Sequence, residues 1–469
     1  MKTAKPYQTA GAEFLTSGGV LLADEPGLGK TLQAIEACKR VDARRILIIC
    51  PAVALAVWRD EIRDCWPEQN PIYLRDADES PDFNALLGAG PVDRVCLITG
   101  YEYLLVNKKA QQVVLAHGMF RKFDVLICDE AHALKSPAAQ RTILIYGAGC
   151  AGGTCITSFA ERTWLLTGTP QLNHPGEWFP HLRCLAPERI PAQSYQGFVA
   201  RYCMTGIRTV RIPARSGRPA RSTTIAVING ANREQLPDLA KRLRGFWLRR
   251  RAVDVLGELP PLEIVTRTLA PDACDPKVLA KIENSEEAQL LRDAIESGDV
   301  DELKKVEGQV SRLRKLFALA KVGATVSWVE SLFDQGIRKV GVWGWHVDAL
   351  AAVAERLKAH GVVTITGATR AAQRGELVKA FQDGPARVFV GQIQAAGTAI
   401  TLTAANRVVF LEQAWTPALN HQAAKRHHRI GQTKPVLAEV LAIDGSIDQA
   451  VAAILTRKAN DISLLENVG

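Results

Sequence analysis

A glycine-rich segment near the start of the chain has the residues of a phosphate-binding loop. Residues 24–31 read DEPGLGKT and follow the apolar run 20–24, which predicts a strand ahead of the loop. Glycines let a backbone wrap a polyphosphate, and a helix beginning at Thr31 would direct its positive end toward the same anions. Lys30 would neutralise the phosphates, and the Thr31 hydroxyl would bind Mg²⁺. The candidate ATP-binding residues of this segment are Gly27, Leu28, Gly29, Lys30 and Thr31.

Two carboxylates follow another apolar run. Residues 128–132 read CDEAH, at the end of the run 124–128. Ligands of open α/β sheets bind at the carboxyl ends of the strands, so these side chains would face the same nucleotide. Asp129 is suited to hold Mg²⁺ through water, and Glu130 to polarise the attacking water as general base. His132 could relay the state of the γ-phosphate to the rest of the molecule.

A third segment reads LLTGTP over residues 165–170. It places Thr167 and Thr169 at the end of a further apolar run, next to a turn. Hydroxyl groups at this point could bridge toward Glu130 and report hydrolysis to a second lobe. These two threonines are therefore candidate coupling residues.

The most distinctive segment comes late in the chain, where residues 421–432 read HQAAKRHHRIGQ. Arg426 and Arg429 stand three residues apart, on one face of the helix expected here, so both guanidiniums could point at one anion. Arginines so placed can act as fingers that stabilise transition-state charge. Gln422, on the flank of the pair, is a candidate coupling residue. The four segments together predict an ATP hydrolase whose site is split across two lobes, which suits coupling of hydrolysis to lobe movement.

Each segment taken alone has a plainer interpretation. The first could be a flexible glycine-rich turn, the second an exposed acidic loop, and the third a polar exit from a strand. The arginine-rich segment could be an exposed basic helix end. Their order along the chain, each beside an expected buried strand, favours the catalytic interpretation.

The elements that must position these segments are short apolar strands separated by helices such as 31–41. Their β-branched and leucine-rich runs lack polar alternation, which is typical of a parallel sheet buried on both faces. A similar rhythm returns after residue 339, so we expect an α/β fold of two lobes. The expected strands are 20–24, 46–50, 95–99, 124–128 and 163–167, then 339–345, 362–366, 387–392, 407–412 and 437–443.

The expected division is a first lobe over residues 1–255 and a second over 256–469, with the linker near Pro260–Pro261. The first lobe would carry a helical and basic insertion at about 172–250, and the second a helical insertion at about 272–320. Within the first insertion, the arginine-rich stretch 201–221 suggests a hairpin or an exposed basic loop. The stretch 236–251, ending in FWLRRR, is predicted to be a basic helix.

Composition sets broader limits. A chain of 469 residues is longer than one hydrophobic core usually supports, and its net charge of +9 favours a polyanionic partner. A solvated basic surface is the alternative. The ten cysteines show no CxxC pair, which argues against a zinc ribbon and fits a reducing compartment. No signal-peptide core and no apolar run of membrane-spanning length is apparent, so we expect no membrane contact and a cytoplasmic protein.

With these segments in place, the chain resembles the Swi/Snf-type family of superfamily-two helicase-like ATPases (DEAH-box DNA translocases). The resemblance covers nearly the whole length and includes KPYQTAGAEFL, ILIICPAVALAVWRDEI, FWLRRRAVDVLGELPP and VGQIQAAGTAITLTAANRVVFLEQAWTPALNHQAAKRHHRIGQ. In its compact length and in the segments FVARYC and AAGTAITLTAA, the chain most resembles the branch that contains annealing helicases. The resemblance implies two RecA-like lobes, each a parallel sheet flanked by helices, in a P-loop NTPase that uses ATP and Mg²⁺.

The resemblance also implies roles for particular residues. It places Gln8 at the adenine, Trp58 at the DNA backbone, and Gly397 among the coupling residues. Basic residues over 201–251 lie where this branch builds a helical protrusion with a basic hairpin, which could contact phosphates. The candidate DNA-binding residues are Trp58, Arg208, Arg211 and Arg215.

The sequence departs from the usual patterns in three places. Asp24 stands where a general phosphate loop has glycine, and Lys425 where family members commonly carry aspartate. Thr398 and Ala399 replace a Gly-Leu step. None of the three removes a residue expected to contact a phosphate.

The expected partner is double-stranded DNA, with forked or branched DNA as candidate forms, bound by a monomer. The type implied is bacterial or phage-encoded and nucleoid-associated. The leading hypothesis is an ATP-dependent double-stranded DNA translocase or remodeller. The alternatives are a strand-separating helicase and a scaffold that binds ATP without cycling.

Overall fold

The computed structural model divides into two compact units. It describes residues 4–69, 71–74, 92–148, 155–171, 173–212, 221–255, 257, 259–283, 285, 288, 307–396, 400–414, 416–446, 448–449 and 452. The first unit, here the first lobe, comprises the described residues of 1–202 and 232–257. The second unit comprises 203–231 and 258–463. We call its part from 258 onward the second lobe, and residues 203–231 the hairpin.

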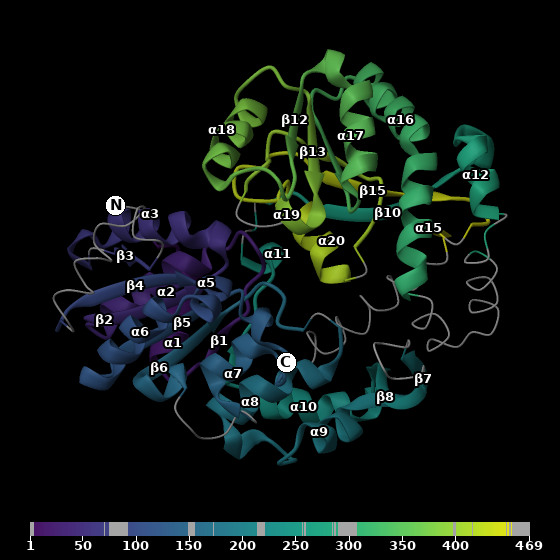
Figure 1. The fold of residues 1–469 in the computed structure, drawn as a ribbon. Helices are drawn as coiled ribbons and strands as arrows, with labels where there is room; N and C mark the ends of the chain where they lie inside the picture. The colour runs from purple at the N-terminus through teal and green to yellow at the C-terminus, as the bar shows by residue number, and fades with distance from the viewer. Residues whose placement is uncertain are drawn as a thin grey trace. The chain divides into compact units, whose positions relative to one another are not determined.

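The first lobe is built on a parallel sheet of seven strands (Figure 1). Its strands run in the order β3-β4-β2-β5-β6-β1-β9, and all the pairings are parallel. The five strands expected from the sequence are confirmed. The strands are β1 (Leu21–Leu22), β2 (Arg45–Cys50), β3 (Pro71–Tyr73), β4 (Val95–Gly100), β5 (Phe123–Asp129), β6 (Ala160–Leu166) and β9 (Trp247–Leu248).

The central strands of this sheet are buried on both faces. Ile46 and Ile48 of β2 enter a hydrophobic cluster with α1, α2 and α3, whereas the alternate residues Leu47 and Ile49 point to the other face and are equally buried. This explains why the strand sequences lack polar alternation. The longer helices of the lobe are α1 (Pro6–Thr16), α2 (Lys30–Arg40), α3 (Leu55–Cys65), α5 (Tyr101–Val106), α6 (Lys108–Phe120), α7 (Gln140–Tyr146), α8 (Phe179–Leu185), α9 (Tyr195–Tyr202) and α10 (Leu236–Leu243).

The basic stretch 236–251 is not one helix, so that prediction was wrong. Helix α10 ends at Leu243, and the chain turns at Gly245, whose φ is +70°. Trp247 and Leu248 then form β9, which pairs with β1. Pairing with the sheet and burial of Trp247 outweigh local helix propensity, because propensity differences are small beside tertiary contacts.

The second lobe has a parallel sheet of six strands in the order β10-β15-β14-β11-β13-β12. One hydrophobic cluster packs α16 and α17 on one face, and another packs α18, α19 and α20 on the other. The expected α/β fold of two lobes is thereby confirmed. The strands are β10 (Leu262–Leu269), β11 (Val340–Gly344), β12 (Val362–Ile365), β13 (Val388–Gln392), β14 (Arg407–Phe410) and β15 (Val436–Ile443).

Strand β10 begins directly after the expected linker at Pro260–Pro261 and was not predicted. Its residues alternate between half-buried and exposed, as befits an edge strand. The helices of the second lobe are α12 (Pro276–Glu283), α15 (Glu307–Ala320), α16 (Val322–Asp334), α17 (Val347–Arg356), α18 (Ala371–Gln382), α19 (Ile393–Ala396) and α20 (Pro417–Ala424). No single described helix is long and apolar enough to cross a membrane; one bent pair, Arg312–Ala320 with Val322–Asp334, passes by length and composition only.

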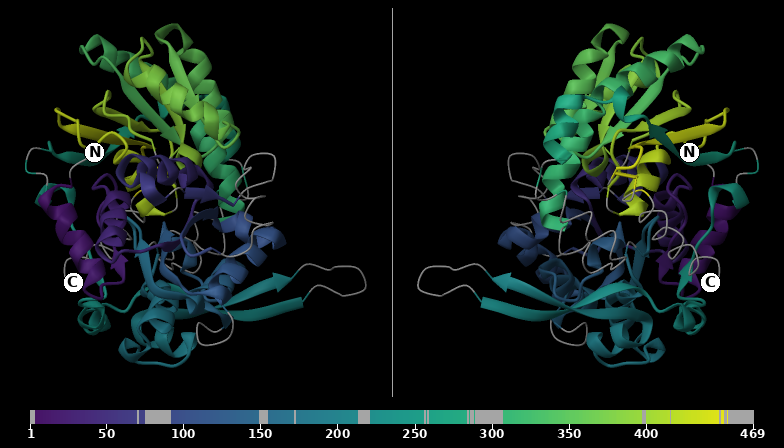
Figure 2. Two further views of the ribbon diagram at one scale, coloured as in Figure 1. Left: turned by 90° about the vertical axis from the view of Figure 1, so that its left-hand side faces the viewer. Right: turned by 90° about the vertical axis from the view of Figure 1, so that its right-hand side faces the viewer.

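The hairpin expected around 201–221 is confirmed. Strands β7 (Cys203–Ile212) and β8 (Arg221–Ala231) pair in antiparallel register, with an irregularity between Met204 and Thr205. Figure 2 shows the two strands side by side as an elongated ribbon. Among the described strands they form a sheet of their own.

Candidate functional site

The candidate catalytic segments of the first lobe gather at one edge of its sheet. Strand β6 lies between β5 and β1, so the loops that follow these three strands emerge side by side at their carboxyl ends. A Cβ on Gly168 would lie 2.7 Å from Pro26, which shows how closely the loop after β6 approaches the phosphate loop. The topology alone therefore brings together the segments that the sequence separates widely.

The phosphate loop has the backbone that its glycines were expected to allow. Gly27 and Gly29 adopt φ values of +97° and +72°, which side-chain-bearing residues rarely adopt. Gly29 caps helix α2, which begins at Lys30, one residue before the expected start. A Cβ at position 29 would also lie 2.5 Å from the amide nitrogen of Gln8. Glycine at this position is thus required by both backbone and packing.

Lys30 and Gln8 both contact the phosphate loop. Lys30 Nζ donates to the carbonyl of Asp24 at 2.7 Å, and Gln8 Nε2 donates to the carbonyl of Leu28 at 3.2 Å. The Lys30 charge also lowers the pKa of both Asp129 and Glu130, so its ammonium group lies within electrostatic reach of both carboxylates. Lys30 thus contacts the loop and favours the charged form of both carboxylates.

Asp129 is the carboxylate that ends β5. Burial and the neighbouring charge of Glu130 raise its pKa to about 6, while a hydrogen bond from Trp58 and the charge of Lys30 lower it. Tyr101 donates a 2.9 Å hydrogen bond to the Asp129 carbonyl, which fixes the backbone at this point. A carboxylate and a threonine hydroxyl such as that of Thr31 are the kind of hard oxygen ligand that Mg²⁺ prefers.

Glu130 lies in a different electrostatic environment from its neighbour. Burial alone would raise its pKa, but a hydrogen bond and charge from His132, followed by the Lys30 charge, lower it below the ordinary value. Its backbone is left-handed, with φ +50°, an uncommon conformation for a residue with a side chain. The result is an ionised carboxylate at neutral pH, the state that a general base requires.

Three of the residues expected to couple hydrolysis to the rest of the molecule, His132, Thr167 and Thr169, form one cluster. His132 Nδ1 lies 3.2 Å from Glu130 Oε2 and 3.1 Å from Thr167 Oγ1. Thr167 Oγ1 lies 3.4 Å from the same Glu130 oxygen and accepts the backbone N–H of Thr169 at 3.1 Å. A change at Glu130 would therefore reach the loop after β6 through direct contacts.

Trp58 does not lie where the sequence placed it. Its side chain is completely buried in the first-lobe core, and its indole N–H donates to Asp129 Oδ2 at 2.9 Å. The prediction of a DNA-backbone contact was wrong, because α3 packs its apolar face against β2, β4 and β5 and turns Trp58 inward. Trp58 instead supports the candidate Mg²⁺ ligand.

The arginines of the second lobe are not on a helical face, so that prediction was also wrong. Helix α20 ends at Ala424, and the chain continues in tighter turns, with Arg426 N–H bonded to the Ala423 carbonyl at 3.1 Å. The buried amide of Gln432 shapes these turns by donating to the carbonyls of His427 and Thr403, each at 3.0 Å. The sequence analysis assigned no role to Gln432, although a buried amide can replace helical hydrogen bonds.

Arg426 and Arg429 differ in burial. Arg426 is 3% exposed, and its Nε has no hydrogen-bond partner among the described residues. Arg429 is half-buried, and its Nη1 donates to Thr401 Oγ1 at 3.1 Å. Gln422 is buried in α20 on the same segment. The structure thus gives Arg429 an orienting partner, Thr401, that the sequence did not reveal.

Lys425, one of the three departures, is buried rather than solvated. Its ammonium lies 3.2 Å from Nδ1 of His428, whose Nε2 is 2.5 Å from the carbonyl of Pro260. The lysine can only donate, so the histidine proton lies on Nε2 and is donated to Pro260. This chain of contacts fastens the arginine segment to the residues that precede β10.

Two of the three candidate DNA-binding arginines of the hairpin lie in a described strand. Arg208 and Arg211 belong to β7, opposite Ile225 and Ser222 of β8. Arg215 and the candidate coupling residue Gly397 lie outside the described residues.

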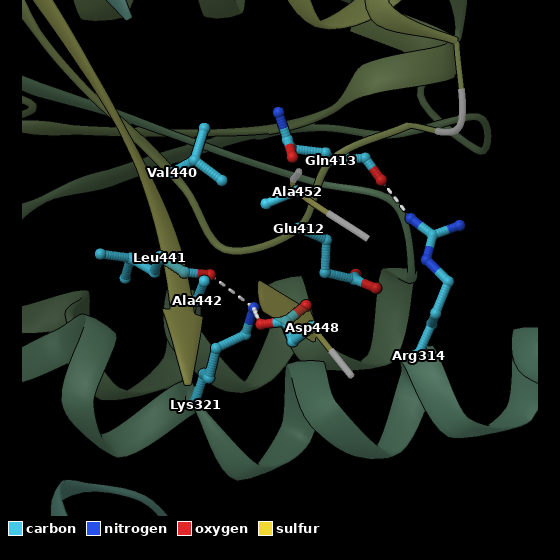
Figure 3. Close-up of a pocket in the computed structure, with 9 residues that line it drawn as sticks. All are labelled: Arg314, Lys321, Glu412, Gln413, Val440, Leu441, Ala442, Asp448 and Ala452. Atoms are coloured by element: carbon cyan, nitrogen blue, oxygen red, sulfur yellow. Dashed lines mark hydrogen bonds and ion pairs between the residues drawn. The ribbon is translucent and has the colours of Figure 1, made fainter. Parts of the chain in front are cut away.

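A small cavity in the second lobe is not a second ligand site. Its volume is about 10 Å³, enough for roughly one water molecule. Figure 3 shows Lys321 in its wall, donating to the Leu441 carbonyl at 2.8 Å and to Asp448 at 2.6 Å. The buried cation is thus neutralised within the lobe.

Comparison with known proteins agrees with the geometry. Residues 7–319 match the model of the SNF2-related domain, and residues 326–431 match the helicase conserved C-terminal domain. The DNA annealing helicase and endonuclease ZRANB3 of Mus musculus is 31% identical over 97% of this chain and 40% of its own length. The SWI/SNF-related matrix-associated actin-dependent regulator of chromatin subfamily A-like protein 1 homolog of Caenorhabditis elegans is 28% identical over 97% and 60% of the two chains.

The chain thus spans about 40% of the length of ZRANB3. Among solved structures, the Sulfolobus solfataricus SWI2/SNF2 ATPase core in complex with dsDNA covers 99% of this chain and 95% of its own, with 21% identity and a TM-score of 0.42. That overlap is distant, and it is the parallel order of the two sheets that identifies the fold.

Proposed function

Because the chain belongs to the SNF2-related family of helicase-like ATPases, we propose that it couples ATP hydrolysis to movement along double-stranded DNA. One observation supports this proposal above the others. Lys30, the Asp129–Glu130 pair and the Thr167 hydroxyl meet at a single edge of the first-lobe sheet. These are the groups that phosphoryl transfer to water requires: a cation that neutralises the phosphates, a metal ligand and a general base. The Thr167 hydroxyl adds a contact through which the state of the base can reach other residues.

In the proposed reaction, the phosphate loop and Lys30 hold the β- and γ-phosphates. Thr31 and Asp129 would hold Mg²⁺, which neutralises charge on the phosphates when bound. Glu130, kept ionised by His132, accepts a proton from the attacking water. Gln8, which contacts the loop through Leu28, is assigned to the adenine end.

We assign the transition-state arginines to the second lobe. Arg429 is oriented by Thr401, and the buried Nε of Arg426 has no hydrogen-bond partner among the described residues. In this proposal they reach the γ-phosphate when the two lobes close on ATP. The Glu130–His132–Thr167 cluster and Gln422 are the proposed coupling residues.

Double-stranded DNA is the proposed partner. A net charge of +9 suits a polyanion, and strand β7 of the hairpin carries Arg208 and Arg211. The relatives named as DNA annealing helicases point to the same class of partner. Neither charge nor name distinguishes translocation from strand separation.

The test compares three DNA forms and two mechanical readouts. ATPase rates are measured with single-stranded, double-stranded and forked DNA, beside displacement of a third strand from a triplex and separation of a forked duplex. The proposal expects stimulation by double-stranded DNA and ATP-dependent triplex displacement without strand separation. Strand separation would favour a helicase instead, and binding of ATP and DNA without turnover would favour a scaffold.

A further inference from the structure

Asp24, the residue that departs from the general phosphate-loop pattern, is the centre of a buried ionic network. Its carboxylate is completely buried and accepts two hydrogen bonds from Arg250, at 3.0 Å from Nε and 2.5 Å from Nη2. Gln33 of helix α2 donates to the same carboxylate at 3.0 Å and accepts from Arg250 Nη2 at 2.8 Å. The three side chains therefore satisfy one another in a closed ring of contacts.

The ring is tied to the backbone of the loop that holds the phosphates. Gln33 Nε2 also donates to the Leu28 carbonyl at 3.1 Å, the same oxygen that Gln8 contacts. Arg250 donates a further hydrogen bond to the carbonyl of Tyr7, at the start of the Gln8 segment. Both ends of the loop and the segment assigned to adenine are thus held by one guanidinium and one amide.

The residues around Arg250 continue the contact along the loop. The N–H of Ala23 donates to the carbonyl of Leu248 at 2.7 Å, and the N–H of Glu25 donates to the carbonyl of Arg250 at 3.0 Å. The Glu25 carboxylate in turn accepts the N–H of Ala252 at 2.8 Å. Residues 248–252 therefore run along residues 23–25 with a hydrogen bond at nearly every step.

A second arginine joins the phosphate loop to its neighbour. Arg249 Nη1 lies 3.2 Å from both the Ala23 carbonyl and the Gly168 carbonyl. Gly168 stands between the two threonines that contact the Glu130 cluster. Arg249 and Arg250 of FWLRRR thus contact the phosphate loop, and Arg249 also contacts the loop after β6.

We propose that Asp24, Gln33 and Arg250 form a clamp that holds the phosphate loop in the conformation that binds the nucleotide. They are positioning residues: none is assigned to touch ATP, and each acts through the loop backbone. The clamp also fixes residues 248–252, which are followed within a few residues by the second lobe, to the loop whose occupancy changes during the cycle. The inference rests on the proposed nucleotide site but not on DNA translocation.

Physical chemistry predicts strong coupling between the two charges. Removing one partner of a buried ion pair leaves the other charge buried and uncompensated, whereas removing both eliminates that penalty. A fork-shaped guanidinium bonded through two nitrogens is also poorly replaced by an ammonium group. Asp24→Asn and Arg250→Gln should therefore each weaken nucleotide binding, and the double variant should bind more tightly than the two single effects multiplied together predict.

The experiment measures binding of a fluorescent ADP to the full chain with Mg²⁺ and without DNA, together with the thermal midpoint of each variant. We expect each single variant to lose tenfold or more in affinity and Arg250→Lys to recover only part of it. The matched control is the adjacent exposed pair, Arg251 and Asp254, whose side chains are 57% and 46% exposed. Arg251→Gln and Asp254→Asn should bind within about twofold of wild type, because exposed pairs contribute little.

A purely structural role gives a different result. It would lower the thermal midpoint while the folded protein binds ADP as tightly as wild type, and this outcome would overturn the clamp. Should the charge variants fail to fold, Gly11→Ala tests the same network without removing a charge, because its Cβ would lie 1.8 Å from Gln33 Oε1. Unchanged ADP affinity in folded Gly11→Ala would equally overturn the clamp.

The two proposals fail separately. If wild type binds ADP and the clamp variants bind it equally well, the clamp is wrong and the nucleotide site stands. If wild type binds ADP and the clamp variants bind it more weakly as expected, but wild type shows no DNA-stimulated ATP hydrolysis, only the translocase proposal fails. If wild type binds no nucleotide, both are contradicted.

Discussion

The indole N–H of Trp58 donates a 2.9 Å hydrogen bond to the carboxylate of Asp129, directly behind the proposed Mg²⁺ site. Trp58 belongs to α3 and is completely buried. Asp129 ends β5 and carries a pKa raised to about 6, chiefly by burial. The tryptophan favours the charged form of a carboxylate that burial would otherwise protonate near neutral pH.

Trp58→Phe should therefore raise the Mg²⁺ concentration that half-saturates the ATPase. Loss of the hydrogen bond raises the pKa of Asp129 further, so more of the carboxyl is protonated at pH 7 and less at pH 8. We expect Trp58→Phe to need a several-fold higher Mg²⁺ concentration than wild type at pH 7, and we expect this difference to be smaller at pH 8. Trp66→Phe, a half-buried tryptophan packed on the same core, is the control. Equal Mg²⁺ curves for Trp58→Phe and wild type at pH 7 would contradict this role.

Arg429→Ala should slow ATP hydrolysis by about 10³-fold or more, the range for arginine fingers, with little change in ATP affinity. Thr401→Val should slow it less, because it removes only the 3.1 Å contact that orients the guanidinium. Single-turnover hydrolysis rates and ATP affinities measure the two effects separately. Lys434→Ala, an exposed cation of the same segment, should leave both unchanged. Equal losses of rate and affinity in Arg429→Ala would argue against a transition-state role.

Replacing Arg208 and Arg211 by glutamine should weaken DNA binding alike for all sequences. Each lost phosphate contact lowers the slope of log affinity against log salt by roughly 1. Binding titrations over a range of salt concentrations measure this slope. Arg162→Gln replaces an arginine whose side chain is 44% exposed on the first lobe and serves as the control. A double variant with the wild-type slope would mean that the hairpin arginines are solvated and contact no phosphate.

The second lobe should lose stability as the pH falls from about 6.5 to 4. Burial lowers the pKa of His427 to about 4, against smaller opposing effects from the carbonyls of Ala405 and Leu402. Between those pH values the unfolded chain binds a proton that the folded lobe does not, so the free energy of unfolding decreases. Trp343 Nε1–H donates to His427 Nε2 at 3.1 Å, which also favours the neutral ring.

His427→Gln should reduce this pH dependence by up to one proton, measured by calorimetric unfolding from pH 7 to 5. His360→Gln, which replaces a histidine with a 29% exposed side chain in the same lobe, should leave the slope close to wild type. If His427→Gln leaves the pH dependence of the free energy of unfolding unchanged, another group must bind the proton.

The sequence predicted the sheets well because their strands are buried on both faces. Continuous apolar runs such as Ile46–Cys50 can hardly form anything else in this context. The short strands β3 and β9 were missed, since two or three residues carry no period of their own. Their pairing depends on neighbours supplied by the rest of the chain.

The candidate site divides in the same way. Loop residues such as Lys30 and Glu130 could be located, because glycines and carboxylates beside strands have few structural uses. The partners that orient them, among them Arg250, Thr401 and Trp58, carry no local signal. In the sequence they cannot be told apart from other residues of a core, a turn or a strand end, because only the fold brings them to the site.

The most direct test of the account is single-turnover ATP hydrolysis by wild type and Glu130→Gln on double-stranded DNA, with DNA affinity measured on the same samples. The account predicts that wild type hydrolyses ATP far faster with DNA than without. It also predicts that Glu130→Gln loses nearly all of this rate and still binds both DNA and ATP. Near-wild-type hydrolysis by Glu130→Gln would contradict the central assignment.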